Sequence, residues 1–161
     1  HIVAGNGGAV IRNDIKANNL VIQNNIIEGV NSLNVPQLVL VQVNGTVANI
    51  INNTFIGTTG ESATVISNTA KNSFIERNVF DTTGTPPVLV SYGYGTGIGS
   101  DGSKTGGVNY NNFNSVAVTK VAVSIGKLNA ENNWWGDLDP SNNIQGLVDF
   151  TPFAKKPFKT R

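Results

Sequence analysis

Two carboxylates and one guanidinium group have the types and spacing that could support catalysis on a polysaccharide. Glu76 and Arg77 are adjacent, and Glu131 recurs at the Glu76 position of a later copy of the same sequence pattern. Neighbouring strands lie about 4.8 Å apart, so two strand steps would separate the carboxylates by about 10 Å. That is just beyond the carboxylate spacing of inverting glycosidases. Glu76, Arg77 and Glu131 are therefore catalytic candidates only for an alternative enzyme function, and we expect no catalysis.

Four aromatic side chains form a second set with binding chemistry. Tyr92 and Tyr94 fall in a glycine-rich insert, Tyr110 follows it, and Trp134 is predicted to point outward from its strand. Exposed aromatic rings stack on the C–H faces of pyranoses, while neighbouring asparagine amides bond the hydroxyl groups. We therefore expect Tyr92, Tyr94, Tyr110 and Trp134 to bind carbohydrate. The alternative explanation for Trp134 is that it covers an open end of the fold.

The glycine-rich insert spans residues 91–107, and its composition predicts a loop. Long loops on a rigid scaffold often carry binding residues, so Asp101 and Lys104 are further candidates. A loop without function is the alternative.

Metal and cofactor sites have little support in the sequence. Cysteine is absent, and the one histidine is His1. Asp137, Asp139 and Asn142 crowd one loop, but they lack the spacing and the glycine of a helix-loop-helix calcium site. Such loops often bond their own backbone. We predict no metal and no cofactor, and calcium near Asp137 and Asp139 stays an open alternative.

A repeated frame must position all these residues. An anchor asparagine is preceded at −5 and −3 by small or apolar residues and followed at +2 by an aromatic or aliphatic residue. We number the copies repeats 1 to 5, with anchors Asn25, Asn53, Asn78, Asn111 and Asn133. Spacings of roughly 20 to 35 residues between copies are typical of stacked-repeat architectures.

Each copy predicts a short strand followed by a bend. Alternation from −5 to −3 has the period of a strand. The anchor asparagine suits the bend, because its amide bonds local backbone and tolerates left-handed angles. Stacked copies would place the asparagines above one another, with their amides bonded along the stack. The residue at +2 would face inward again and enter the core.

Valine-rich runs precede the later copies and predict further strands. They occupy residues 38–43, 63–66, 88–90 and 121–125. Short β-branched runs without helical spacing between them favour a parallel sheet coiled into a solenoid. The stretch L-V-I-Q-N-N-I-I from Leu20 also fits a leucine-rich repeat, which is the competing fold.

Length and charge indicate a single domain, 1–161, that ends in a basic tail at 154–161. Hydrophobic residues make up 39% and charged residues 13% of the chain. Because the basic residues concentrate in the tail, the body is mildly acidic, which argues against nucleic acid as a partner. No apolar run reaches membrane-spanning length, so no membrane insertion is expected. The start at His1 without methionine predicts a fragment of a longer surface protein, and an unpaired first repeat predicts possible end-to-end self-association.

The end of the sequence resembles a known family. Asn-Asn-Trp-Trp-Gly at 132–136 is followed by an acidic, proline-containing loop and by V-D-F-T-P-F at 148–153. This ending is similar to that of right-handed parallel β-helix repeat domains, which occur in secreted and surface-attached microbial proteins and in pectate-lyase-like polysaccharide enzymes. The resemblance implies an all-β fold, a right-handed parallel β-helix (solenoid) with a C-terminal cap, located outside the cell or at its surface.

Together, the residues and the resemblance predict a non-catalytic extracellular module that contacts polysaccharide or cell-wall glycan or acts as an adhesin. The first alternative is a fragment of a polysaccharide lyase or glycoside hydrolase. The second is a structural spacer of a surface protein. The same ending is attached to many activities, so it indicates the fold better than the function.

Overall fold

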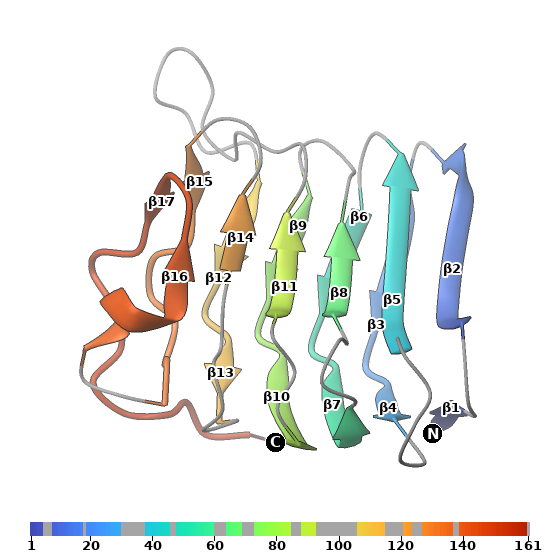
Figure 1. Cartoon of the computed structure of the whole chain (residues 1–161), viewed down its shortest axis with the longest axis horizontal. Coiled ribbons are helices and arrows are strands. Elements are labelled where there is room, and N and C mark those ends of the chain that lie inside the picture. Colours follow the sequence, from blue (N-terminus) through green and yellow to red (C-terminus); the bar gives the residue numbers. More distant parts are fainter. Residues whose placement is uncertain are drawn as a thin grey trace.

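Parallel strands make up most of the described chain (Figure 1). The computed structural model describes residues 1–4, 8–17, 19–29, 38–45, 48–59, 64–68, 73–84, 88–92, 106–114, 121–123, 127–136 and 139–160. The elements are β1 (Ile2–Ala4), β2 (Gly8–Ala17), β3 (Leu20–Gln23), β4 (Ile26–Gly29), β5 (Leu38–Gly45), β6 (Ala48–Ile51), β7 (Thr54–Thr59), β8 (Thr64–Asn68), β9 (Phe74–Glu76), β10 (Val79–Gly84), β11 (Val88–Tyr92), β12 (Gly107–Asn109), β13 (Asn112–Phe113), β14 (Val121–Val123), β15 (Leu128–Asn129), the 3-10 helix η1 (Pro140–Asn143), β16 (Ile144–Gln145) and β17 (Val148–Asp149).

Three larger sheets and one two-stranded sheet contain these strands, and every pairing among the described residues is parallel. Their strand orders are β1-β4-β7-β10-β13, β16-β14-β11-β8-β5-β2 and β12-β9-β6-β3, while β15 pairs with β17 alone. The chain visits the three sheets in turn, so the blue strands lie at one end of Figure 1 and the red strands at the other. The prediction of an all-β fold with parallel strands is confirmed for the described residues.

The core is built from equivalent positions of the five repeats. Phe80 pairs with Phe55 on one side and with Phe113 on the other, so the +2 residues of repeats 2 to 4 are in register. Their rings stack with centroids 4.8–4.9 Å apart, and Trp135 continues the column at 4.8 Å from Phe113. All four side chains are fully buried. This column, with the −3 residues beside it, is the predicted hydrophobic core. The −3 residues are Ile22, Ile50, Ile75, Val108 and Ala130.

The anchor asparagines form the predicted ladder of amides. In each of the four steps the Nδ2 of one anchor donates to the Oδ1 of the next, at 3.0–3.1 Å. The backbone N–H of the same residue donates to the same oxygen, at 2.8–3.0 Å. Asn53, Asn78, Asn111 and Asn133 are also buried. Because buried amides are costly without partners, this ladder explains why the frame requires asparagine.

The left-handed backbone lies one residue before each anchor, which corrects the prediction that the anchor itself takes it. The residues with φ between 55° and 62° are Asn24, Asn52, Arg77, Tyr110 and Asn132. An anchor must direct its amide along the ladder, so the preceding residue makes the sharp turn. Asparagine tolerates this conformation well, whereas arginine and tyrosine do so at a cost.

The ladder ends at the C-terminal side of the structure. There, β17 pairs with β15, and the Ala154 N–H donates to the Asn133 carbonyl at 2.9 Å. The equivalent bond one repeat earlier runs from the Trp134 N–H, one residue after the anchor Asn133, to the Asn111 carbonyl. Phe153, one residue before Ala154, therefore occupies the position of an anchor in the stack. Like Asn53, Asn78 and Asn111, Asn133 donates through its Nδ2 to the −3 carbonyl of the preceding repeat, here Val108. Having no asparagine beyond it, Asn133 makes its second Nδ2 bond to the Ala130 carbonyl.

Several strands extend beyond the apolar runs that predicted them. The strand β2 covers ten residues and pairs with β5, although only a short apolar run marks it in the sequence. The ends of the 91–107 insert belong to strands β11 and β12, and residues 93–105 lie outside the described residues. Within the part of the chain that the structure describes, no helix has the length and apolar character needed to cross a membrane.

Candidate functional site

Tyr110 lies at the bend between β12 and β13. Its backbone is left-handed, with φ 59°. Its side chain is exposed, as predicted, with 44% of the residue surface accessible. The ring meets the ring of Phe158 edge-on, with centroids 6.2 Å apart. A residue near the end of the chain therefore contacts the exposed ring of Tyr110.

Asn112 fixes the C-terminal tail beside Tyr110. The Phe158 N–H donates to Asn112 Oδ1 at 2.8 Å, and Asn112 Nδ2 donates to the Phe158 carbonyl at 2.9 Å. Both the oxygen and the nitrogen of the Asn112 side-chain amide are therefore hydrogen-bonded, and Asn112 is only 4% exposed. In Figure 1 the chain accordingly runs back from the red strands toward β13 before it ends. The tail is thus held against the strands at this point.

Trp134 completes this group of residues. It forms a parallel bridge with Asn112, and its N–H donates to the Asn111 carbonyl at 2.9 Å. The residue is half-buried, in contrast to the fully buried Trp135. Its half-burial fits both a binding role and a covering role. We call Tyr110, Asn112, Trp134 and Phe158 the aromatic corner.

Tyr92, another predicted sugar-binding residue, does not join the aromatic corner. Tyr92 ends strand β11 and pairs with Asn68 and Val123, in a different sheet from β12 and β13. Tyr94, and with it Asp101 and Lys104, lies outside the described residues.

Sequence reasoning missed Asn112 and Phe158 as members of the site. They are 46 residues apart, and no local pattern links positions at that separation. One signal was available: Phe158 is an aromatic residue in an otherwise basic tail. Asn112 also places an amide at +1, where repeats 1 to 3 carry isoleucine, threonine and valine.

The catalytic candidates of the alternative function lie along one row of strands. Glu76 pairs in register with Asn109, whose Nδ2 donates to the Glu131 carbonyl at 3.0 Å. Glu76 and Glu131 are therefore two levels apart, as expected, which corresponds to about 10 Å. Arg77 occupies the left-handed position and is exposed.

Glu76 is not a fully solvated carboxylate. The side chain is half-buried, and burial raises its pKa, while the adjacent Arg77 guanidinium partly opposes the rise. Desolvation disfavours the charged carboxylate, and a nearby cation favours it. A raised carboxyl pKa is a property of general acids, but structural positions show it as well.

Asp139 is engaged by its own loop. Its Oδ1 accepts bonds from the Ser141 hydroxyl at 2.6 Å and from the Ser141 N–H at 3.2 Å, at the start of η1. These two bonds lower the pKa of the carboxyl. Asp137 lies outside the described residues. Among the residues that the structure describes, no group of three histidine, cysteine or acidic residues could hold a metal ion.

No family model, curated protein or solved structure matches the chain.

Proposed function

We propose that the chain is a non-catalytic module, outside the cell or at its surface, that contacts polysaccharide or cell-wall glycan as a binding or adhesive domain. We further infer that its strands form a right-handed parallel β-helix. The repeated visit to three parallel sheets and the continuous asparagine ladder support this arrangement.

One observation supports the binding role: the stability of the fold does not explain why a tyrosine occupies position 110. Three of the other four bends carry asparagine at the same left-handed position, where tyrosine is strained. The residue is also 44% exposed and does not belong to the buried hydrophobic core. An aromatic ring that costs stability and faces solvent fits a surface that stacks on sugar rings. The edge contact with Phe158 fixes its orientation.

The test replaces Tyr110 with the residue that the other bends use. Tyr110→Asn removes the ring and suits the left-handed backbone, so the variant should be at least as stable as the wild type. We expect the wild type to be retained on insoluble polysaccharides, and Tyr110→Asn to bind about 3- to 10-fold more weakly, as the loss of one stacking contact predicts. Ile26→Asn is the matched control, because Ile26 is equally exposed, at 46%, in repeat 1.

Equal retention of Tyr110→Asn and the wild type would reject the role of the ring. Absence of retention on every glycan tested would leave the structural spacer as the better description.

The enzyme fragment is the second candidate, supported by the raised pKa of Glu76. It predicts release of unsaturated or reducing sugars by the wild type and loss of that release in Glu76→Gln. Sugar release that survives this substitution would exclude Glu76 as the general acid.

End-to-end self-association stays a proposal, supported by the edge position of β3 and by Val21, which is 53% exposed on that strand. Sedimentation that shows only monomers at high concentration would contradict it.

A further inference from the structure

The C-terminal tail forms a hollow that lies beside the aromatic corner. It has a volume of about 440 Å³ and is lined by Ala154, Lys155, Lys156, Pro157, Phe158 and Lys159. The six lining residues form one continuous segment, so the hollow is a partly open depression along the tail. The carbohydrate-binding residues predicted from the sequence do not include any of these.

The hollow carries concentrated positive charge. Lys155, Lys156 and Lys159 are all exposed, and none makes an ion pair with another described residue. No acidic residue follows Asp149 in the sequence. An extended chain advances at most about 3.6 Å per residue, so the backbone positions of the three lysines span less than about 15 Å. Their mutual repulsion is relieved when an anion binds between them.

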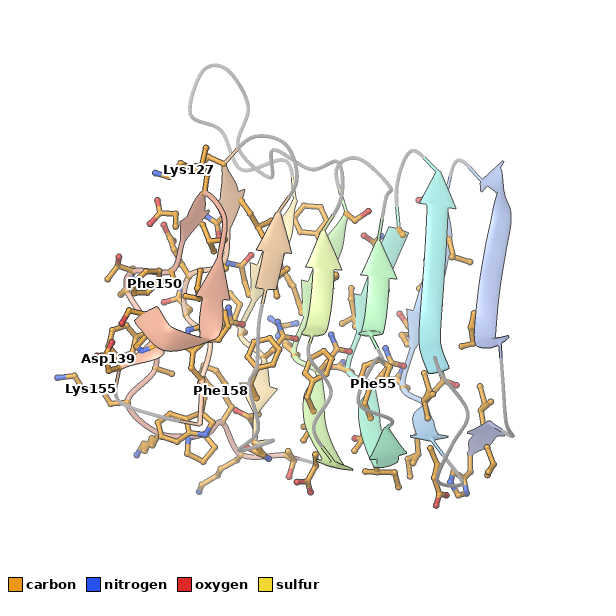
Figure 2. The ribbon with its side chains drawn as sticks, in the orientation of Figure 1. Phe55, Lys127, Asp139, Phe150, Lys155 and Phe158 are labelled. Carbon is orange, nitrogen blue, oxygen red and sulfur yellow. The ribbon has the colours of Figure 1, made fainter. Side chains whose placement is uncertain are left out.

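The strands hold this charged segment in place. The Ala154 N–H bonds to the Asn133 carbonyl at one end, and Asn112 grips the Phe158 backbone near the other. The lysines therefore belong to an anchored segment, and part of the ordering cost of binding is already met by folding. In Figure 2, Lys155 extends away from the strands into solvent.

The walls of the hollow also offer an apolar surface. Pro157 and Phe158 contribute to it, and Phe158 remains 38% exposed while its ring contacts Tyr110. A ligand that matches both features has an apolar face and a negative charge. Simple phosphate lacks the face, and a neutral sugar lacks the charge.

We propose that this hollow binds an anionic saccharide, a sugar ring that carries a carboxylate or sulfate group. The ring packs on Pro157 and Phe158, and the combined positive charge of Lys155, Lys156 and Lys159 attracts the anionic group. This inference rests on the proposed function and names the class of glycan that it contacts.

Three polymers with one glucan backbone test the role of charge. The full chain is titrated with dextran, carboxymethyl-dextran and dextran sulfate, and binding is followed by calorimetry. We expect the charged polymers to bind at least about 10-fold more tightly than dextran, with an affinity that falls as salt screens the lysines. The carboxymethyl and sulfate arms show which anionic group is preferred. Equal affinity for all three polymers would overturn the proposal.

Substitutions then locate the site. The triple variant Lys155→Gln, Lys156→Gln, Lys159→Gln should bind charged dextrans no better than dextran. Lys127→Gln is the control, because Lys127 is an exposed lysine paired with Asp149 at 2.9 Å, and in Figure 2 it lies well above Lys155 on the same side of the structure. It should bind as the wild type does. Undiminished binding by the triple variant would place the anion elsewhere and reject the site.

Two further measurements separate charge from shape. Asn112→Ala keeps every lysine but releases the grip on the tail, so it should weaken binding to charged dextrans without abolishing it. Polyphosphate supplies charge without a sugar ring and should bind more weakly than dextran sulfate. If polyphosphate binds equally well, the tail is a general polyanion site and the saccharide assignment is wrong.

These results are distinguishable from failure of the proposed function. If neutral insoluble glycans are retained through Tyr110 while charge has no effect, only the further inference fails. If neither neutral nor charged glycans bind, both fail.

Discussion

Asn53 donates twice to one oxygen of Asn78. Its backbone N–H reaches Asn78 Oδ1 at 2.9 Å, and its Nδ2 reaches the same atom at 3.1 Å. Asn78 in turn donates through its Nδ2 to the Ile50 carbonyl at 2.8 Å and to Asn111 Oδ1 at 3.0 Å. All of these bonds are buried. One side chain therefore joins three successive repeats, and removing it leaves polar groups on both sides without partners.

We expect Asn78→Ala to lower the free energy of unfolding by roughly 2–5 kcal/mol, because several buried donors and acceptors lose their bonds together. Chemical denaturation followed by circular dichroism measures the loss. Asn19→Ala is the control, since Asn19 is exposed, and it should change the free energy by less than about 0.5 kcal/mol. A similar small effect for Asn78→Ala would show that the ladder contributes little.

The ring column predicts a second large effect. Phe80 lies between Phe55 and Phe113, at 4.9 and 4.8 Å, and is completely buried. Phe80→Ala should therefore reduce the free energy of unfolding by about 3–5 kcal/mol through lost burial and a cavity. Phe158→Ala provides a comparison, because the Phe158 ring is partly exposed, and its cost should be much smaller. Equal losses in the two variants would contradict the assignment of the column as the core.

Arg77 provides a stabilising prediction. It occupies a left-handed bend, with φ 55°, where repeats 1, 2 and 5 have asparagine. Arg77→Asn should raise the free energy of unfolding by roughly 0.5–1 kcal/mol, because asparagine is less strained there. Thermal unfolding in a Glu76→Gln background measures this effect without the charge interaction between Arg77 and Glu76. An unchanged or lower melting temperature would show that the arginine side chain makes a compensating contribution.

Glu76 predicts a dependence of stability on pH. Its pKa in the folded chain is raised above the ordinary value of 4.5 by burial. In the window just above 4.5 the folded state holds more protons than the unfolded state, so stability falls as the pH rises through that window. At lower pH the carboxyl is protonated in both states, and the penalty vanishes.

Glu76→Gln should therefore unfold at a higher denaturant concentration than the wild type at neutral pH. The difference should shrink as the pH falls toward 4.5 and nearly vanish below that value. Glu28→Gln is a suitable comparison from another strand. If the advantage of Glu76→Gln did not depend on pH, desolvation of the carboxylate would not be its cause.

Local sequence was sufficient to predict the repeat, the strand type and the core. A single frame combined alternation before each anchor with an inward aromatic after it, and both follow from the geometry of an extended chain. The same frame predicted the amide ladder, because identical residues in register must stack. The exposure of Tyr110 followed from its position as well. These features depend only on neighbours along the chain and on repetition.

The tertiary structure decided which residue takes the left-handed turn and where the tail lies. The turn moves to the residue before the anchor because the anchor amide is committed to bonds with other repeats. The side chain of Asn112 bonds the backbone of Phe158, which lies in a distant part of the chain. Every residue has the same backbone groups, so the residue types alone do not reveal this contact. The raised pKa of Glu76 also depends on burial by the folded chain. Sequence periodicity determines the stack, whereas long-range contacts determine the surface that could bind a ligand.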